Sequence, residues 1–314
     1  MIELRDVCKK YGPKYALQKA NFTIERGEIV GFLGQNGAGK STALNIMTGY
    51  LAATSGTVLF DGADMRRHAR DVRHHMGYMP EVPPLYDDMT VEEYLRFVCE
   101  LRRVNRRAAK AHVERLCELT GLGVMRRRLV RNLSKGYRQR VGLASALAGD
   151  PEVLILDEHT AGLDPSQIVE IRSLIKHLGR NHTIILSSHI LHDVSEVCEE
   201  IIIIHQGKIL KQDSLSHLIA EANETPVFHA CVQGDLRGAR EAVEALEGVT
   251  EVRASESREE GCVDLCVLAQ RGMDLRRSLC ELFWRLEMPM LTLKREEMDL
   301  EDVFLRTVGT EKEA

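Results

Sequence analysis

The chain has 314 residues, of which 44% are apolar and only 5% aromatic, and its formal net charge is -5 at neutral pH. This length exceeds that of a typical single core, so we expect one large domain and a smaller one. The acidic balance argues against nucleic-acid binding as the main role, which needs a net basic surface. We interpret the local basic runs at residues 65–75 and 126–128 as solvated faces.

Eight cysteines are scattered without a CxxC pair or other metal-ligand spacing, and they are predicted to be small buried residues in a reducing compartment. Cys262 and Cys266 share one face of an alternating strand, where zinc ligation is only a minor alternative. The N-terminus opens with an alternating strand pattern instead of the apolar segment of a signal peptide. Apolar runs such as residues 201–204 fall far short of the roughly 20 residues of a membrane span. We therefore expect a cytosolic chain that reaches a membrane only through a partner.

From the N-terminal strand onward, the first two thirds of the chain predict an α/β domain. Aliphatic runs at residues 28–33, 153–156 and 183–186 are each followed by a turn and a helical pattern. Such runs are typical of strands that are buried on both faces of a parallel sheet. Between residues 90 and 147 the pattern is helical only, which predicts a helical subdomain at about residues 83–145. Residues 201–210 follow as a hairpin with its turn at Gln206-Gly207.

A break in periodicity at residues 221–226 predicts a boundary that divides the chain into domains 1–222 and 223–314. The second domain has the order βαββαβ, which predicts a small ferredoxin-like α+β fold. Its elements are expected at residues 227–232 (strand), 236–246 (helix), 249–254 (strand), 262–268 (strand), 275–286 (helix) and 290–294 (strand).

The segment GQNGAGKST satisfies the pattern GxxxxGK[ST] between a predicted strand and a predicted helix. Its glycines let backbone N–H groups surround phosphates, and the helix N-terminus adds a favourable dipole. Lys40 would reach the outer phosphates of ATP, and the Ser41 hydroxyl would ligate magnesium. A chance glycine-rich turn is the alternative, which the strand-helix context disfavours. The predicted nucleotide-binding residues are Gly34, Gln35, Asn36, Gly37, Ala38, Gly39, Lys40, Ser41 and Thr42.

The run VLILDE at residues 153–158 ends a predicted buried strand with two acids. The carboxyl edge of the sheet should bring them to the same phosphates. Asp157 is predicted to hold magnesium through water, and Glu158 to polarise the attacking water as general base. Acids at strand ends are common, so this interpretation depends on the phosphate loop.

The segment LSKGYRQR at residues 133–140 resembles the LSGGQ signature of the ATP-binding cassette (ABC) family, although it departs at Lys135 and Tyr137. It keeps Ser134 and Gly136, the two positions that the family uses. A helix that begins there would present a hydroxyl and backbone N–H groups to a γ-phosphate. In the family that phosphate belongs to ATP on the opposite subunit. The resemblance therefore implies a head-to-tail dimer, homomeric or heteromeric, with a P-loop ATPase fold.

Other family elements follow in order over residues 1 to about 220. Tyr11 lies where the family stacks an aromatic ring on adenine, although a lone tyrosine is more often part of a core. Asp164 in AGLDP resembles the loop that couples the two sites of a dimer. His189 in SSHIL resembles the switch histidine that bonds the γ-phosphate.

Two positions depart from the family pattern. Glu81 stands where most members have a glutamine that senses magnesium, and its carboxylate could still accept from a magnesium-bound water. His159 replaces the usual proline after the two acids, so the turn loses a locked φ but no catalytic atom. We expect slower or differently coupled hydrolysis.

Three segments, at residues 77–95, 133–146 and 300–309, resemble the exporter branch of the family that includes gliding-motility, drug and polysaccharide export ATPases. The resemblance implies an ATP-hydrolysing subunit at the inner face of the membrane with its permease on a separate chain, and no nucleic-acid partner. Two alternatives remain: a cassette protein that acts on ribosomes or DNA, and a non-catalytic regulator. A single cassette disfavours the first, and the presence of Lys40, Glu158 and His189 disfavours the second.

Overall fold

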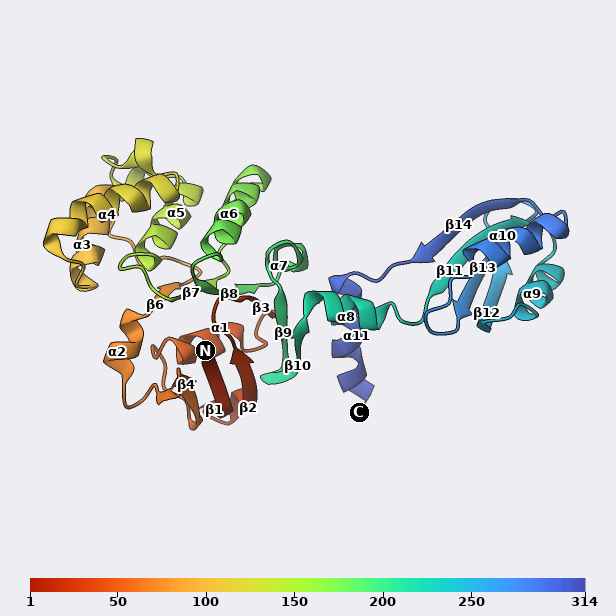
Figure 1. Ribbon diagram of the computed structural model, residues 1–314, viewed down its shortest axis with the longest axis horizontal. Coiled ribbons are helices and arrows are strands. Elements are labelled where there is room, and N and C mark those ends of the chain that lie inside the picture. Colours follow the sequence, from red (N-terminus) through yellow and green to blue (C-terminus); the bar gives the residue numbers. More distant parts are fainter. Residues whose placement is uncertain (314) are drawn as a thin grey trace. The chain divides into compact units, whose positions relative to one another are not determined.

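The computed structural model describes residues 1–313 and divides into two compact units (Figure 1). The first contains Met1–Leu215 together with the end of the chain from Thr307, and the second contains Ser216–Arg306. The sequence placed the division at residues 222 and 223 and assigned the end of the chain to the second domain. No helix within residues 1–313 combines the length and the apolar character that a membrane span requires.

A six-stranded sheet with the strand order β10-β9-β3-β8-β7-β6 forms the centre of the first unit. All neighbours are parallel except β10, which pairs antiparallel with β9 in the predicted hairpin. Strands β3, β7 and β8 are buried along their whole length, as their continuous aliphatic runs predict. The bounds are β3 Ile29–Leu33, β6 Met76–Met79, β7 Val153–Asp157, β8 Thr183–Ser188, β9 Glu200–His205 and β10 Lys208–Ser214.

A second sheet of the first unit has the order β2-β1-β4-β5 and is antiparallel. Its inward side chains and those of α1 (Lys40–Met47) join the central sheet in one apolar core, in which Phe22 stacks at a tilt on Phe32 with ring centroids 5.4 Å apart. This core fixes the start of α1 against two sheets. The bounds are β1 Ile2–Tyr11, β2 Lys14–Ile24, β4 Ser55–Phe60 and β5 Ala63–Asp64.

The predicted helical subdomain contains α3 (Val91–Leu101), α4 (Arg106–Leu119) and α5 (Lys135–Ala146). Thr90 begins α3 with a capping box, in which its hydroxyl accepts from the Glu93 N–H and the Glu93 carboxylate accepts from the Thr90 N–H. Arg126, expected on a solvated face, is half-buried and pairs with two glutamates of the subdomain. The remaining helices of the first unit before residue 200 are α2 Ala69–His74, η1 Gly123–Met125, η2 Val130–Asn132, α6 Pro165–Leu178 and α7 Leu191–Val197.

The second unit confirms the predicted βαββαβ order, with an antiparallel sheet in the order β12-β13-β11-β14. Alternate residues of the sheet form an apolar core with α9 and α10. The bounds are β11 Val227–Gln233, α9 Leu236–Glu244, β12 Val249–Glu256, β13 Cys262–Ala269, α10 Arg276–Arg285 and β14 Met290–Glu296. Helices α8 (Leu215–Ala222) and α11 (Leu300–Glu313) flank this fold in the sequence.

The expectation that all cysteines are buried is wrong for three of them. Cys8 and Cys266 are half-buried, and Cys280 is exposed. Cys280 belongs to the amphipathic helix α10, whose Leu279 and Phe283 face the core. A helix of this kind leaves its opposite face in water.

Candidate functional site

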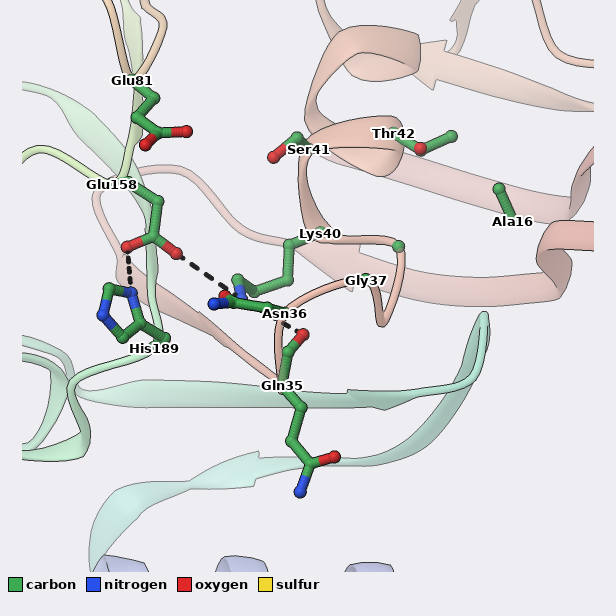
Figure 2. Close-up of a pocket in the computed structure, with 11 residues that line it drawn as sticks. Ala16, Gln35, Asn36, Gly37, Lys40, Ser41, Thr42, Glu81, Glu158 and His189 are labelled. Carbon is green, nitrogen blue, oxygen red and sulfur yellow. Dashed lines mark hydrogen bonds and ion pairs between the residues drawn. The ribbon is translucent and has the colours of Figure 1, made fainter. Parts of the chain in front are cut away.

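The predicted phosphate loop borders a cavity of about 360 Å³ at the start of α1 (Figure 2). The residues that line it come from β2, the loop, α1 and the ends of three further segments. They are Ala16, Gln35, Asn36, Gly37, Gly39, Lys40, Ser41, Thr42, Glu81, Glu158 and His189. Most of the residues predicted for the nucleotide, and all three predicted for catalysis, therefore share one cavity.

The loop owes its shape to glycines and to close packing against β2. Gly39 caps α1 with φ 112°, which side-chain-bearing residues rarely adopt, and a Cβ there would come within 2.5 Å of the Ala16 carbonyl oxygen. The loop is thus a cradle of backbone that a single added methyl group would distort. Ala16 was not among the predicted site residues, because no local motif connects β2 to the loop.

Lys40 and His189 both contact the carboxylate of Glu158 (Figure 2). The Lys40 ammonium lies 3.5 Å from Oε1 and donates to the Gly34 carbonyl at 2.6 Å, while His189 Nδ1 lies 2.6 Å from Oε2. Lys40 and Glu158 are almost fully buried, at 5% and 9% exposure. An ammonium and an imidazole therefore meet at one carboxylate beside the glycine-rich loop.

The two acids at the end of β7 are held by β8. Asp157 is buried and accepts a hydrogen bond from the Ser187 hydroxyl, its partner in the parallel register. Glu158 has φ 47°, and its N–H donates to the Ser187 carbonyl and hydroxyl at 3.2 and 3.1 Å. A non-glycine residue in this region is strained, which is typical of functional sites. Ser187 was not predicted, although its place at the end of the neighbouring parallel strand was the available signal.

Glu81 links the cavity to the helical subdomain. Its side chain lines the cavity, and its carbonyl accepts from the amide of the buried Gln139 on α5 at 3.1 Å. Pro83 packs so tightly on α5 that a Cβ on Gly142 would lie 2.5 Å from its ring. A displacement of Glu81 would therefore move α5, the helix that begins at the signature segment, through these two contacts.

The signature segment and the Asp164 loop lie beside each other. Ser134 caps α5, and Asp164 caps α6 by accepting from the Gln167 N–H at 3.0 Å, which holds the pKa of Asp164 below its ordinary value. The Gln167 side chain covers Gly136, where a Cβ would meet its amide oxygen at 2.3 Å. Neither segment belongs to the cavity lining, and Gln167 was not predicted.

Four other predicted residues also lie outside the lining of the cavity. Gly34 and Ala38 belong to the loop but face the core, where Gly34 closely approaches the Ile204 carbonyl. Tyr11 ends β1 and is half-exposed, with the Lys9 ammonium 5.3 Å from its ring centroid. Asp157 directly precedes Glu158, is buried and accepts a hydrogen bond from the Ser187 hydroxyl.

His159 occupies an unusual environment directly after Glu158. Its ring is 3% exposed, and neither nitrogen has a hydrogen-bond partner among residues 1–313. Burial lowers the pKa of His159 from its ordinary 6.5 to about 4, although Asp193 and Glu158 oppose this effect. The neighbouring Thr160 donates to Asp193 at 2.6 Å, and Asp193 also pairs with Arg172. The departure from proline therefore places a neutral imidazole in the interior.

This arrangement defines a phosphate-loop ATPase: a strand leads through a glycine-rich loop into a helix that begins with lysine, and a nearby parallel strand ends in two acids. The family model described as "ABC transporter" matches residues 17–161. The chain is 32% identical to the bacitracin transport ATP-binding protein BcrA of Bacillus licheniformis, over 98% of this chain and 97% of the relative. It is 30% identical to the uncharacterized ABC transporter ATP-binding protein YxlF of Bacillus subtilis, over 98% and 99%. The chain thus belongs to the family of ABC transporter ATP-binding subunits.

Solved structures of this family share the fold of about two thirds of this chain. The dimeric ABC transporter cassette MJ0796 is 26% identical and covers 68% of this chain and 99% of its own, with a TM-score of 0.64. A post-hydrolysis state of the same cassette with ADP and phosphate bound matches equally well. The protein is accordingly an ATPase subunit of an ABC transporter. The alternative of a ribosomal or nucleic-acid cassette is not favoured, because the relatives that match over their full length carry transporter names.

Proposed function

We propose that the cavity at Lys40 binds magnesium-ATP and hydrolyses it, and that the energy drives export through a permease on a separate chain. The observation that carries this proposal is the convergence of Lys40 and His189 on the Glu158 carboxylate beside the glycine-rich loop. A polyphosphate matches this combination of a backbone cradle, a buried ammonium and a nearby carboxylate, which is the set of groups that phosphoryl-transfer sites use.

Each side chain has a distinct role in this proposal. Lys40 neutralises charge on the β- and γ-phosphates, and His189 donates to the γ-phosphate. Glu158 accepts a proton from the attacking water. The residues present fit magnesium, since Ser41 and Glu81 line the cavity with the hard oxygen atoms that this ion prefers. Asp157, which directly precedes Glu158 and lies outside the lining, would hold the ion through a water. When bound, magnesium would neutralise charge that develops on the transferred phosphoryl group.

Two copies are proposed to enclose two nucleotides in a head-to-tail dimer. Ser134, Gly136 and Asp164 lie outside the cavity of their own chain, next to each other at the starts of α5 and α6. Such helix starts present unpaired N–H groups that suit phosphate oxygens of another copy. The dimer would be stable only while ATP supplies contacts on both sides, so ATP shifts the population toward the closed pair.

The helical subdomain is proposed to engage the permease at the cytoplasmic face of the membrane. The path from the cavity through Glu81 to Gln139 on α5 supplies a physical route from nucleotide to subdomain. Export is inferred from the relatives named for bacitracin and lantibiotic transport.

Glu158→Gln tests the proposal. It should lower ATP hydrolysis by about 10² to 10⁴-fold, the range for a lost general base. With magnesium-ATP it should accumulate as a dimer of twice the 35.4 kDa chain in light scattering. The matched control Glu118→Gln changes an exposed glutamate on α4 and should behave as wild type. A Glu158→Gln protein that hydrolyses ATP normally, or that stays monomeric with ATP while retaining ATP binding, would contradict the proposal.

A further inference from the structure

The sheet of the second unit has two unlike faces. On β11 and β13 the apolar residues that pack against α9 and α10 alternate with a second set that points the other way. Cys231 and Cys262 belong to this second set, yet they are only 8% and 9% exposed. Neither cysteine belongs to the apolar core of the unit. Their burial on the face away from the helices needs another explanation.

The loop between β12 and β13, residues 257–261, folds over the two thiols. The Ser257 hydroxyl lies 3.7 Å from Cys231 Sγ, and the Ser257 N–H donates to the Cys262 carbonyl. The Cys262 N–H in turn donates to the Glu259 carbonyl at 3.1 Å. These two backbone hydrogen bonds close the loop as a tight turn. The thiol and carboxylate atoms of Cys231, Cys262 and Glu259 all lie within 4.8 Å of one another.

The positions of the two cysteines disfavour a disulfide. In the antiparallel register Cys231 is paired with Asp264 and Cys262 with Gln233, so the cysteines are diagonal neighbours. Diagonal Cα atoms lie about 7–8 Å apart, whereas a disulfide usually needs about 4.4–6.8 Å. Two thiols that lie near each other without a disulfide can instead both bind one metal ion.

We propose that Cys231, Cys262 and Glu259 form a binding site for a thiophilic divalent cation, of which Zn²⁺ is the best match. Zn²⁺ accepts two thiolates and one carboxylate, and a fourth position remains for water. Mg²⁺ and Ca²⁺ are poor matches because they require oxygen ligands. The spacing of the cysteines in the sequence does not reveal this site, because the pairing of β11 with β13 brings Cys231 to Cys262 and Glu259.

Such an ion would tie the loop at residues 257–261 to β11. Glu259 is exposed and lies in the loop, whereas both cysteines are fixed in strands. The bound cation would therefore immobilise the loop and stabilise the second unit, because folding brings the ligands together. None of the residues that line the nucleotide cavity belongs to this unit, so the site is independent of the function proposed above.

The test uses the full chain after reduction and removal of metal. This protein is titrated with Zn²⁺ in competition with a chromophoric chelator and, separately, with Co²⁺. We expect one ion per chain and a sulfur-to-cobalt charge-transfer band. Cys231→Ser, Cys262→Ser and Glu259→Gln should each weaken binding by at least about tenfold, since even outer-shell changes cost that much. Binding should also raise the unfolding temperature of the wild-type chain but not of Cys231→Ser.

Cys266→Ser is the matched control, because Cys266 lies on the same face of β13 but outside the cluster. This variant should bind as wild type. Glu259→Gln keeps the test informative if a cysteine variant folds poorly, since Glu259 is exposed. The proposal is overturned if the wild-type chain gives no charge-transfer band, or if the three ligand variants bind Zn²⁺ as tightly as Cys266→Ser does. Formation of a Cys231–Cys262 disulfide without metal uptake would overturn it as well.

Discussion

The buried imidazole of His159 makes the stability of the first unit depend on pH in a defined way. In the native state its pKa is about 4, because burial disfavours the charged ring, and in the unfolded chain it returns to 6.5. As pH falls from 6.5 to 4, the unfolded state takes up a proton that the native state does not, so stability is lost as pH falls. Linkage gives about 2 kcal/mol lost at pH 5 and about 3 kcal/mol below pH 4.

Replacing the ring with a similar apolar side chain isolates this effect. His159→Leu also removes two buried nitrogens without partners among residues 1–313, each of which costs about 1–3 kcal/mol when left unsatisfied. We therefore expect His159→Leu to be at least as stable as wild type at pH 7.5, and its advantage to grow by about 2 kcal/mol at pH 5.

Urea unfolding followed by circular dichroism at the two pH values measures this difference, and other titrating groups cancel between the variants. His68→Leu, at an exposed histidine before α2, is the control and should follow wild type at both pH values. A constant difference between His159→Leu and wild type across this pH range would refute the reasoning. A large loss of stability at pH 7.5 would show that the ring has polar partners in the native state.

Three further outcomes follow from contacts in the structure. Glu81→Gln should raise the half-saturating magnesium concentration for ATP hydrolysis by about fivefold, since a charge contact across water contributes about 1 kcal/mol; unchanged hydrolysis and permease stimulation would exclude a role for the charge. Thr90→Ala removes the capping hydroxyl of α3 and should cost about 1 kcal/mol in urea unfolding while ATP binding stays normal. Phe283→Ala opens the core of the second unit and should cost about 3–5 kcal/mol there. The ATPase rate of this variant should be unchanged, because no cavity-lining residue belongs to the second unit. Rapid proteolysis together with loss of ATPase activity would show that the first unit needs the second in order to stay folded.

Features encoded by neighbouring residues could be predicted from the sequence. Aliphatic runs predicted the buried strands β3, β7 and β8, and the residues after the break at 221–226 predicted the βαββαβ order of the second unit. The phosphate loop was recognisable because its glycines, Lys40 and Ser41 act together within one turn of chain.

The sequence by itself therefore determined the class of fold, the βαββαβ order of the second unit and the phosphate-binding loop. Only the tertiary structure decided which distant groups meet. Ser187 donates a hydrogen bond to Asp157, Gln167 packs over Gly136, and Cys231 lies beside Cys262. It also decided the left-handed backbone of Glu158 and the dry surroundings of His159. The physical reason is that strand register and core packing depend on side chains far apart in the chain, whereas turns, caps and amphipathic periods depend on near neighbours.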